Sequence, residues 1–89
     1  MRAARAPCPV PTVLRLDGFD FRIYTEDHAP AHVHVFVGRF EARIAIGDAT
    51  VAPFAIDPGG MSTREVRDAI RIVEVHQAVF LGIWRTYHG

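Results

Sequence analysis

The chain has 89 residues, of which 49% are hydrophobic, and ten arginines balance ten acidic residues. This length predicts one small domain with a single core, and the zero net charge excludes a strong electrostatic footprint for nucleic acid across the whole chain. No apolar run approaches the roughly 20 residues that cross a bilayer, so we expect no membrane association.

Residues 1–9 are expected to form a flexible N-terminal arm ahead of a single domain at residues 10–89. The arm runs into three prolines at positions 7, 9 and 11 and has little to bury. It also lacks the apolar core of a signal peptide, so we expect a cytoplasmic protein. Cys8 is the only cysteine, which excludes an internal disulfide and a thiolate zinc cluster within one chain.

A first hairpin is predicted where Asp17-Gly18 separates the alternating segments 12–16 and 19–25. Asp-Gly is a strong signal for a two-residue turn. The resulting register opposes apolar to apolar side chains and arginine to aspartate. The predicted pairs are Leu16 with Phe19, Arg15 with Asp20, and Leu14 with Phe21.

A second hairpin is predicted around Gly38-Arg39, which joins segments 32–37 and 40–46. Its register opposes Val35 to Ala42, Val33 to Ile44, and His34 to Arg43. A further turn at Gly47-Asp48 then leads into a strand at residues 49–54, where Pro53 suits a sheet edge because it has no N–H.

The C-terminal third predicts one amphipathic helix that starts at Ser62 or Thr63. Glu65 completes a capping box with Ser62, apolar residues recur at helical spacing as far as Trp84, and Gly82 marks a site for a kink. The predicted fold class is therefore α+β: an antiparallel β-meander of four to five strands with a C-terminal amphipathic helix packed on one face.

Strand alternation assigns the side chains to two sheet faces, of which the helix covers the apolar one. The opposite face is expected to be uncovered, with its histidines partly exposed. It carries Arg22, Tyr24, His32, His34, Phe36, Glu41 and Arg43. His28 belongs to the loop before this face, so its relation to the other two histidines stays open.

The segment Glu26-Asp27-His28-Ala29-Pro30-Ala31-His32-Val33-His34-Val35, together with the opening strand and the helix ending near Trp84, resembles the bacterial family called domain of unknown function 4160. The resemblance runs from about Val10 to the C-terminus, with Ala31 in place of the usual second proline. It implies a compact domain, often encoded beside a second small protein in arrangements that look like toxin–antitoxin pairs. It implies no established activity.

Three functions are compatible with this pattern. In the first, the protein is an intracellular partner-binding domain, one member of such a gene pair. Its partner is then a protein encoded by a neighbouring gene, or a second copy of the chain. Aromatic residues and arginines are enriched at interfaces, so the binding residues are predicted to be Arg22, Tyr24, Phe36 and Arg43.

The second function is a metal-independent endoribonuclease of the toxin type. Histidines supply a general base and a general acid, and arginines grip phosphate. The candidate catalytic residues are His28, His32 and His34, with RNA held by Arg22 and Arg43.

The third function is metal binding through His28, His32 and His34, with Glu26, Asp27 and Glu41 as the available carboxylates. Arg43, directly opposite His34, disfavours a cation there. The sequence therefore leads us to expect no metal and no cofactor, and it leaves open whether the protein is an enzyme.

Overall fold

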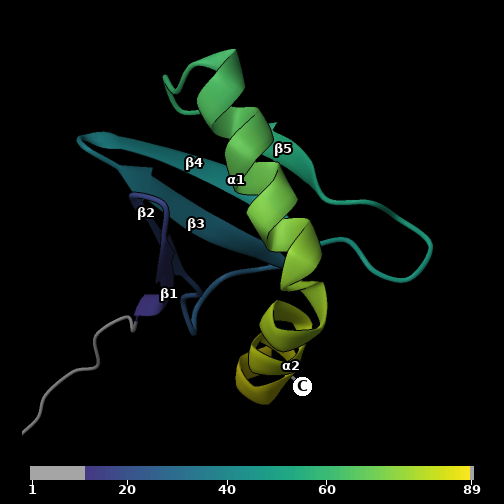
Figure 1. Cartoon of the computed structure of the whole chain (residues 1–89). Coiled ribbons are helices and arrows are strands. Elements are labelled where there is room, and N and C mark those ends of the chain that lie inside the picture. The colour runs from purple at the N-terminus through teal and green to yellow at the C-terminus, as the bar shows by residue number, and fades with distance from the viewer. Residues whose placement is uncertain (1–11, 89) are drawn as a thin grey trace, which may run out of the picture.

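The computed structural model describes residues 12–88, so the expected arm at residues 1–9, with Cys8, lies outside the described residues. Within that range the chain forms β1 (Thr12–Leu16), β2 (Phe19–Arg22), β3 (His32–Val37), β4 (Phe40–Ala45), β5 (Phe54–Asp57), α1 (Thr63–Val75) and α2 (Gln77–His88). The strands form one antiparallel sheet in chain order. α1 crosses one face of this sheet, and α2 lies at its end (Figure 1). The predicted α+β meander is confirmed.

Both predicted hairpin registers are confirmed. Leu16 opposes Phe19 in the first hairpin, and His34 opposes Arg43 in the second. Asp17 and Gly18 have φ angles of 54° and 85°, as a type I′ turn requires at both central positions. The turn chemistry therefore fixes which side chains of β1–β4 share a face.

The predicted strand at residues 49–54 is wrong, because the last strand is β5, Phe54–Asp57. Residues 47–53 form a loop instead, which projects from the sheet in Figure 1. Asp48 Oδ1 accepts hydrogen bonds from Thr50 N at 2.8 Å and Val51 N at 3.0 Å. These side-chain bonds satisfy backbone groups that a strand would have paired with a neighbour.

The predicted single helix is divided into α1 and α2 at His76, whereas Gly82 lies inside α2 without a break. Ser62 caps α1, and the predicted capping box with Glu65 is present. At the break, Gln77 Nε2 donates to the carbonyl oxygens of Ile46 at 2.9 Å and Asp48 at 3.2 Å. These contacts tie the start of α2 to the loop that follows β4.

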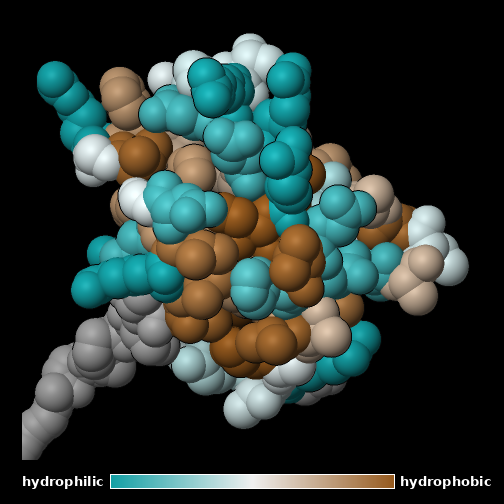
Figure 2. Space-filling model, in the orientation of Figure 1, coloured by the Kyte–Doolittle hydropathy of each residue, from teal (hydrophilic) through white to brown (hydrophobic). Residues whose placement is uncertain are grey.

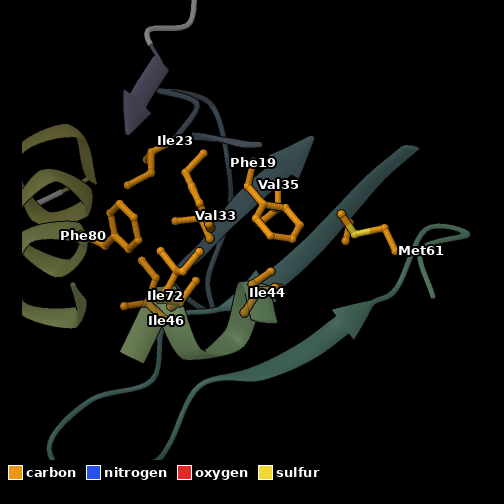
Figure 3. Close-up of a cluster of buried hydrophobic side chains, with 13 residues drawn as sticks. Phe19, Ile23, Val33, Val35, Ile44, Ile46, Met61, Ile72 and Phe80 are labelled. Carbon is orange, nitrogen blue, oxygen red and sulfur yellow. The ribbon is translucent and has the colours of Figure 1, made fainter. Parts of the chain in front are cut away.

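The core lies between the sheet and the helices, and Figure 3 shows its side chains pointing toward one another. Phe80 from α2 is fully buried, and its ring centroid lies 5.7 Å from that of Phe21 in β2. Fully burying a large apolar side chain contributes about 1.5–3 kcal/mol. This packing therefore holds α2 against the end of the sheet.

Neither described helix has the length and apolar character needed to cross a bilayer.

Candidate functional site

His32 and His34 lie two positions apart in β3, so both side chains emerge on the sheet face opposite the core. The expectation that they are partly exposed is wrong, because each residue is only 7% exposed. Trp84 of α2 covers His32, with ring centroids 5.4 Å apart, and Tyr24 covers His34 at 4.1 Å. Strand alternation assigns a face, but it does not reveal that a loop and a helix end fold over it.

Asp27 brings the two histidines together. Its Oδ2 atom lies 3.0 Å from His34 Nε2 and 3.4 Å from His32 Nε2. Asp27 belongs to the loop between β2 and β3, and its side chain is 16% exposed. Two imidazole nitrogens and one carboxylate oxygen therefore converge within 4.8 Å of one another, in a largely buried position.

The other nitrogen of each histidine has its own acceptor. His32 Nδ1 lies 2.8 Å from the carbonyl oxygen of Pro30, and His34 Nδ1 lies 2.7 Å from Glu41 Oε2. A carbonyl and an ionised carboxylate only accept hydrogen bonds, so both Nδ1 atoms carry the proton. In the neutral imidazoles, the Nε2 lone pairs then point toward Asp27.

This arrangement requires positive charge at its centre. Nitrogen lone pairs that face a carboxylate oxygen at 3.0–3.4 Å repel it, unless protons or a metal ion lie between them. A tetrahedral ion with bonds of about 2.0–2.1 Å separates adjacent ligand atoms by roughly 3.3 Å. The two separations that Asp27 Oδ2 makes bracket that value, and all three atoms lie within 4.8 Å of one another, so the cluster is a candidate site for one ion.

The surroundings also resemble those of known metal-bound histidines. Such histidines usually donate their second N–H to a backbone carbonyl, a carboxylate or a water molecule, which fixes the ring orientation. Here the Pro30 carbonyl and the Glu41 carboxylate occupy those positions. Each histidine therefore has one ring nitrogen in the cluster with Asp27 and the other ring nitrogen bound to a fixed acceptor.

The two arginines expected near the histidines bond to other partners. Arg43 faces His34 in register, yet its guanidinium lies 3.5 Å from Asp57. Arg22 donates to Asp20 at 3.1 and 3.2 Å. The interpretation that Arg43 disfavours a cation at His34 is therefore not supported, because the charged side chains that bond to His34 are carboxylates.

The remaining predicted binding residues lie around this cluster. The Arg22 guanidinium carbon lies 4.4 Å from the centroid of the Phe36 ring, and its hydrogen bond to Asp20 raises the pKa of Arg22. Burial, followed by the nearby charge of Glu41, raises the pKa of Tyr24. Tyr24 is therefore a neutral phenol at neutral pH, and its uncharged ring packs against the imidazole of His34.

His28 is not part of the cluster. The residue is exposed, and no hydrogen bond, ion pair or ring contact joins it to another described residue. Asp27, the residue before it, supplies the third ligand atom. The sequence identified Asp27 only as one of three available carboxylates, because strand register gives no information about where a loop side chain points.

The comparison with protein families agrees with the resemblance seen in the sequence. The model described as domain of unknown function (DUF4160) matches residues 18–85. The chain belongs to this family. The matched range contains Asp27, His32, His34 and Glu41, so the whole cluster lies within the DUF4160 domain. Searches of curated proteins and of solved structures gave no match.

Proposed function

We propose that this DUF4160 domain binds one divalent transition-metal ion through Asp27 Oδ2, His32 Nε2 and His34 Nε2. The observation that carries the proposal is the convergence of the two Nε2 atoms on one carboxylate oxygen, at 3.4 and 3.0 Å. Because acceptors hold both Nδ1 atoms, the two Nε2 lone pairs are directed at the position of the ion.

The ligand types favour zinc or a similar ion. Imidazole suits Zn²⁺, Cu²⁺, Fe²⁺ and Ni²⁺, whereas Mg²⁺ and Ca²⁺ prefer sites built from oxygen alone. Three protein ligands leave a coordination position for water. When bound, the ion would activate that water as a nucleophile or hold a further ligand.

Metal retention tests this proposal. The protein, purified without a histidine tag, is treated with EDTA, desalted, incubated with Zn²⁺ and desalted again, and its metal content is then measured. We expect about one equivalent of zinc per chain in the wild type and none in Asp27→Asn. Glu26→Gln, which removes a neighbouring carboxylate in the same loop, should retain the ion. Wild-type protein that keeps no zinc contradicts the proposal.

Partner binding, in an intracellular toxin–antitoxin-like setting, is the second candidate. An apolar surface where α1 passes into α2 favours it, since Val75 and Val79 are 73% and 57% exposed (Figure 2). A patch of this kind is typical of an interaction surface. Co-purification with the product of the neighbouring gene tests this candidate. Val79→Lys should weaken the complex, and a complex with unchanged affinity would exclude this patch.

The geometry favours the ribonuclease less. A general acid and base must reach the substrate, whereas His32 and His34 are 7% exposed. Both predicted phosphate-binding arginines, Arg22 and Arg43, already bond to aspartates. RNA cleavage in EDTA that is lost in His34→Gln would restore this candidate.

A further inference from the structure

A groove lies beside His32 on the same face of the sheet. Ala45 of β4 pairs with His32 on one side and with Phe54 of β5 on the other, so these three side chains share a row on that face. α2 and the loop after β4 complete the groove. Its volume of about 450 Å³ falls within the range of roughly 300–1,000 Å³ for small-molecule sites.

The groove has a small residue at its base and aromatic side chains beside it. Ala45 is 2% exposed, whereas Phe54, its partner on the adjacent strand β5, is 47% exposed. On the other side Trp84 is held in place, since its ring centroid lies 5.4 Å from that of His32 and 3.9 Å from that of His88. This arrangement leaves room above Ala45 for a flat ring that contacts aromatic neighbours.

A positive charge lies in the same lining. Arg85, next to Trp84 in α2, is exposed. Its charge is near enough to the Asp48 carboxyl to help lower the pKa of that group, but no hydrogen bond or close ion pair joins its guanidinium to another described residue. Asp48 also lines the groove, but its Oδ1 atom already accepts three hydrogen bonds from Thr50 and Val51. Arg85 therefore offers its planar fork of N–H groups to an anion.

We propose that this groove binds a small molecule made of a flat aromatic ring with one anionic group, a phosphate or a carboxylate. The ring lies over Ala45 between Phe54 and Trp84, and the anion pairs with Arg85. This inference goes beyond the proposed metal function and does not depend on it, because none of the three metal ligands lines the groove.

The experiment uses the single tryptophan of the chain. In a ¹H–¹⁵N NMR spectrum, the indole N–H of Trp84 gives one signal of its kind. Adenosine 5′-monophosphate and 2-naphthoate are the two anionic aromatic probes, and adenosine and inorganic phosphate are the controls. We expect at least one aromatic anion to shift the indole signal and to saturate the shift at millimolar concentration or below. Its dissociation constant should be lower than that of either control. The difference in affinity between adenosine 5′-monophosphate and adenosine isolates the contribution of the phosphate.

Two exposed residues of the groove and one control residue on α1 provide the variants. Arg85→Gln should weaken binding of the anionic probe by roughly tenfold, whereas Arg64→Gln, the same change on exposed α1 surface, should leave it unchanged. Phe54→Ala should weaken the anionic probe and adenosine alike. Absence of any saturable shift, equal binding of inorganic phosphate, or full affinity in Arg85→Gln would overturn the proposal. Each probe is titrated both in the presence of EDTA and in the presence of Zn²⁺, so that probe binding is measured independently of metal binding.

Discussion

Asp27 Oδ2 lies 3.0 Å from His34 Nε2, although the two residues come from a loop and from the strand that follows it. The same oxygen lies 3.4 Å from His32 Nε2. This contact fastens the β2–β3 loop over the sheet and directs both imidazoles at one point. It turns a pair of strand histidines into a set of three ligand atoms.

Glu41 is expected to tune metal affinity without touching the ion, because its carboxylate accepts from His34 Nδ1 at 2.7 Å. Changes at such outer partners typically cost 10–100-fold in affinity. We expect Glu41→Ala to weaken zinc binding by about that factor in a competition titration with a chromogenic chelator. Glu74→Ala removes an exposed carboxylate from α1 and serves as the control. Equal affinities of the two variants would show that Glu41 has no such role.

Zinc is expected to stabilise the fold, because it joins the β2–β3 loop to β3. An ion present at 100 times its dissociation constant contributes about 2.7 kcal/mol to the free energy of unfolding. For a domain of this size, that raises Tm by roughly 11–22 °C. Thermal unfolding followed by circular dichroism measures the shift. Asp27→Asn should show none, and a shift of the same size in that variant would place the bound ion elsewhere.

Two glycines are expected to respond to alanine in opposite directions. Gly59 has a φ of 60°, and an added Cβ would collide with the backbone carbonyl of Glu41, so Gly59→Ala should lower the free energy of unfolding by at least about 2 kcal/mol. Gly82 lies inside α2 with open space around it, so Gly82→Ala should add about 0.5–1 kcal/mol. Urea denaturation measures both. A neutral Gly59→Ala would contradict the close contact with β4.

Asp48 is expected to make the fold sensitive to acid. Hydrogen bonds from Thr50 lower the pKa of its carboxyl group, so folding favours the charged form. That contribution is complete above the ordinary aspartate pKa of about 3.9 and is lost as the pH falls through the lowered value in the folded protein. The wild type should therefore have a higher Tm than Asp48→Asn at pH 7, and the difference should shrink below about pH 4. A difference that widens on acidification would contradict this assignment.

The hairpins and the start of α1 could be predicted because local residues determine them. Asp17-Gly18 and Gly38-Arg39 set the two registers, and Ser62 with Glu65 sets the first turn of α1. The position of β5 was missed, because the side chain of Asp48 replaces strand bonds in the loop before it. The break at His76 was missed because Gln77 bonds to carbonyl groups some thirty residues earlier, on the other side of the core.

The candidate site could be predicted only in part, for the same reason. Alternation correctly placed His32 and His34 on one face, since that depends on β3 alone. Burial of that face depends on Trp84, and the third ligand depends on the loop that returns Asp27 to the strand. Contacts of this kind join distant segments or rest on loop conformation, and neither leaves a periodic signal in the sequence.

Calorimetric titration with Zn²⁺ of the wild type, His34→Gln and His28→Gln determines whether the Asp27–His32–His34 cluster binds the metal ion. The two variants remove histidines from the same motif, but only His34 contributes to the cluster. We predict one equivalent bound with equal affinity by the wild type and His28→Gln, and a loss beyond the 10–100-fold of an outer-shell change in His34→Gln. Far-ultraviolet circular dichroism verifies that each variant is folded. Unchanged zinc affinity in folded His34→Gln, or an equal loss in His28→Gln, would show that the ion does not bind at this cluster.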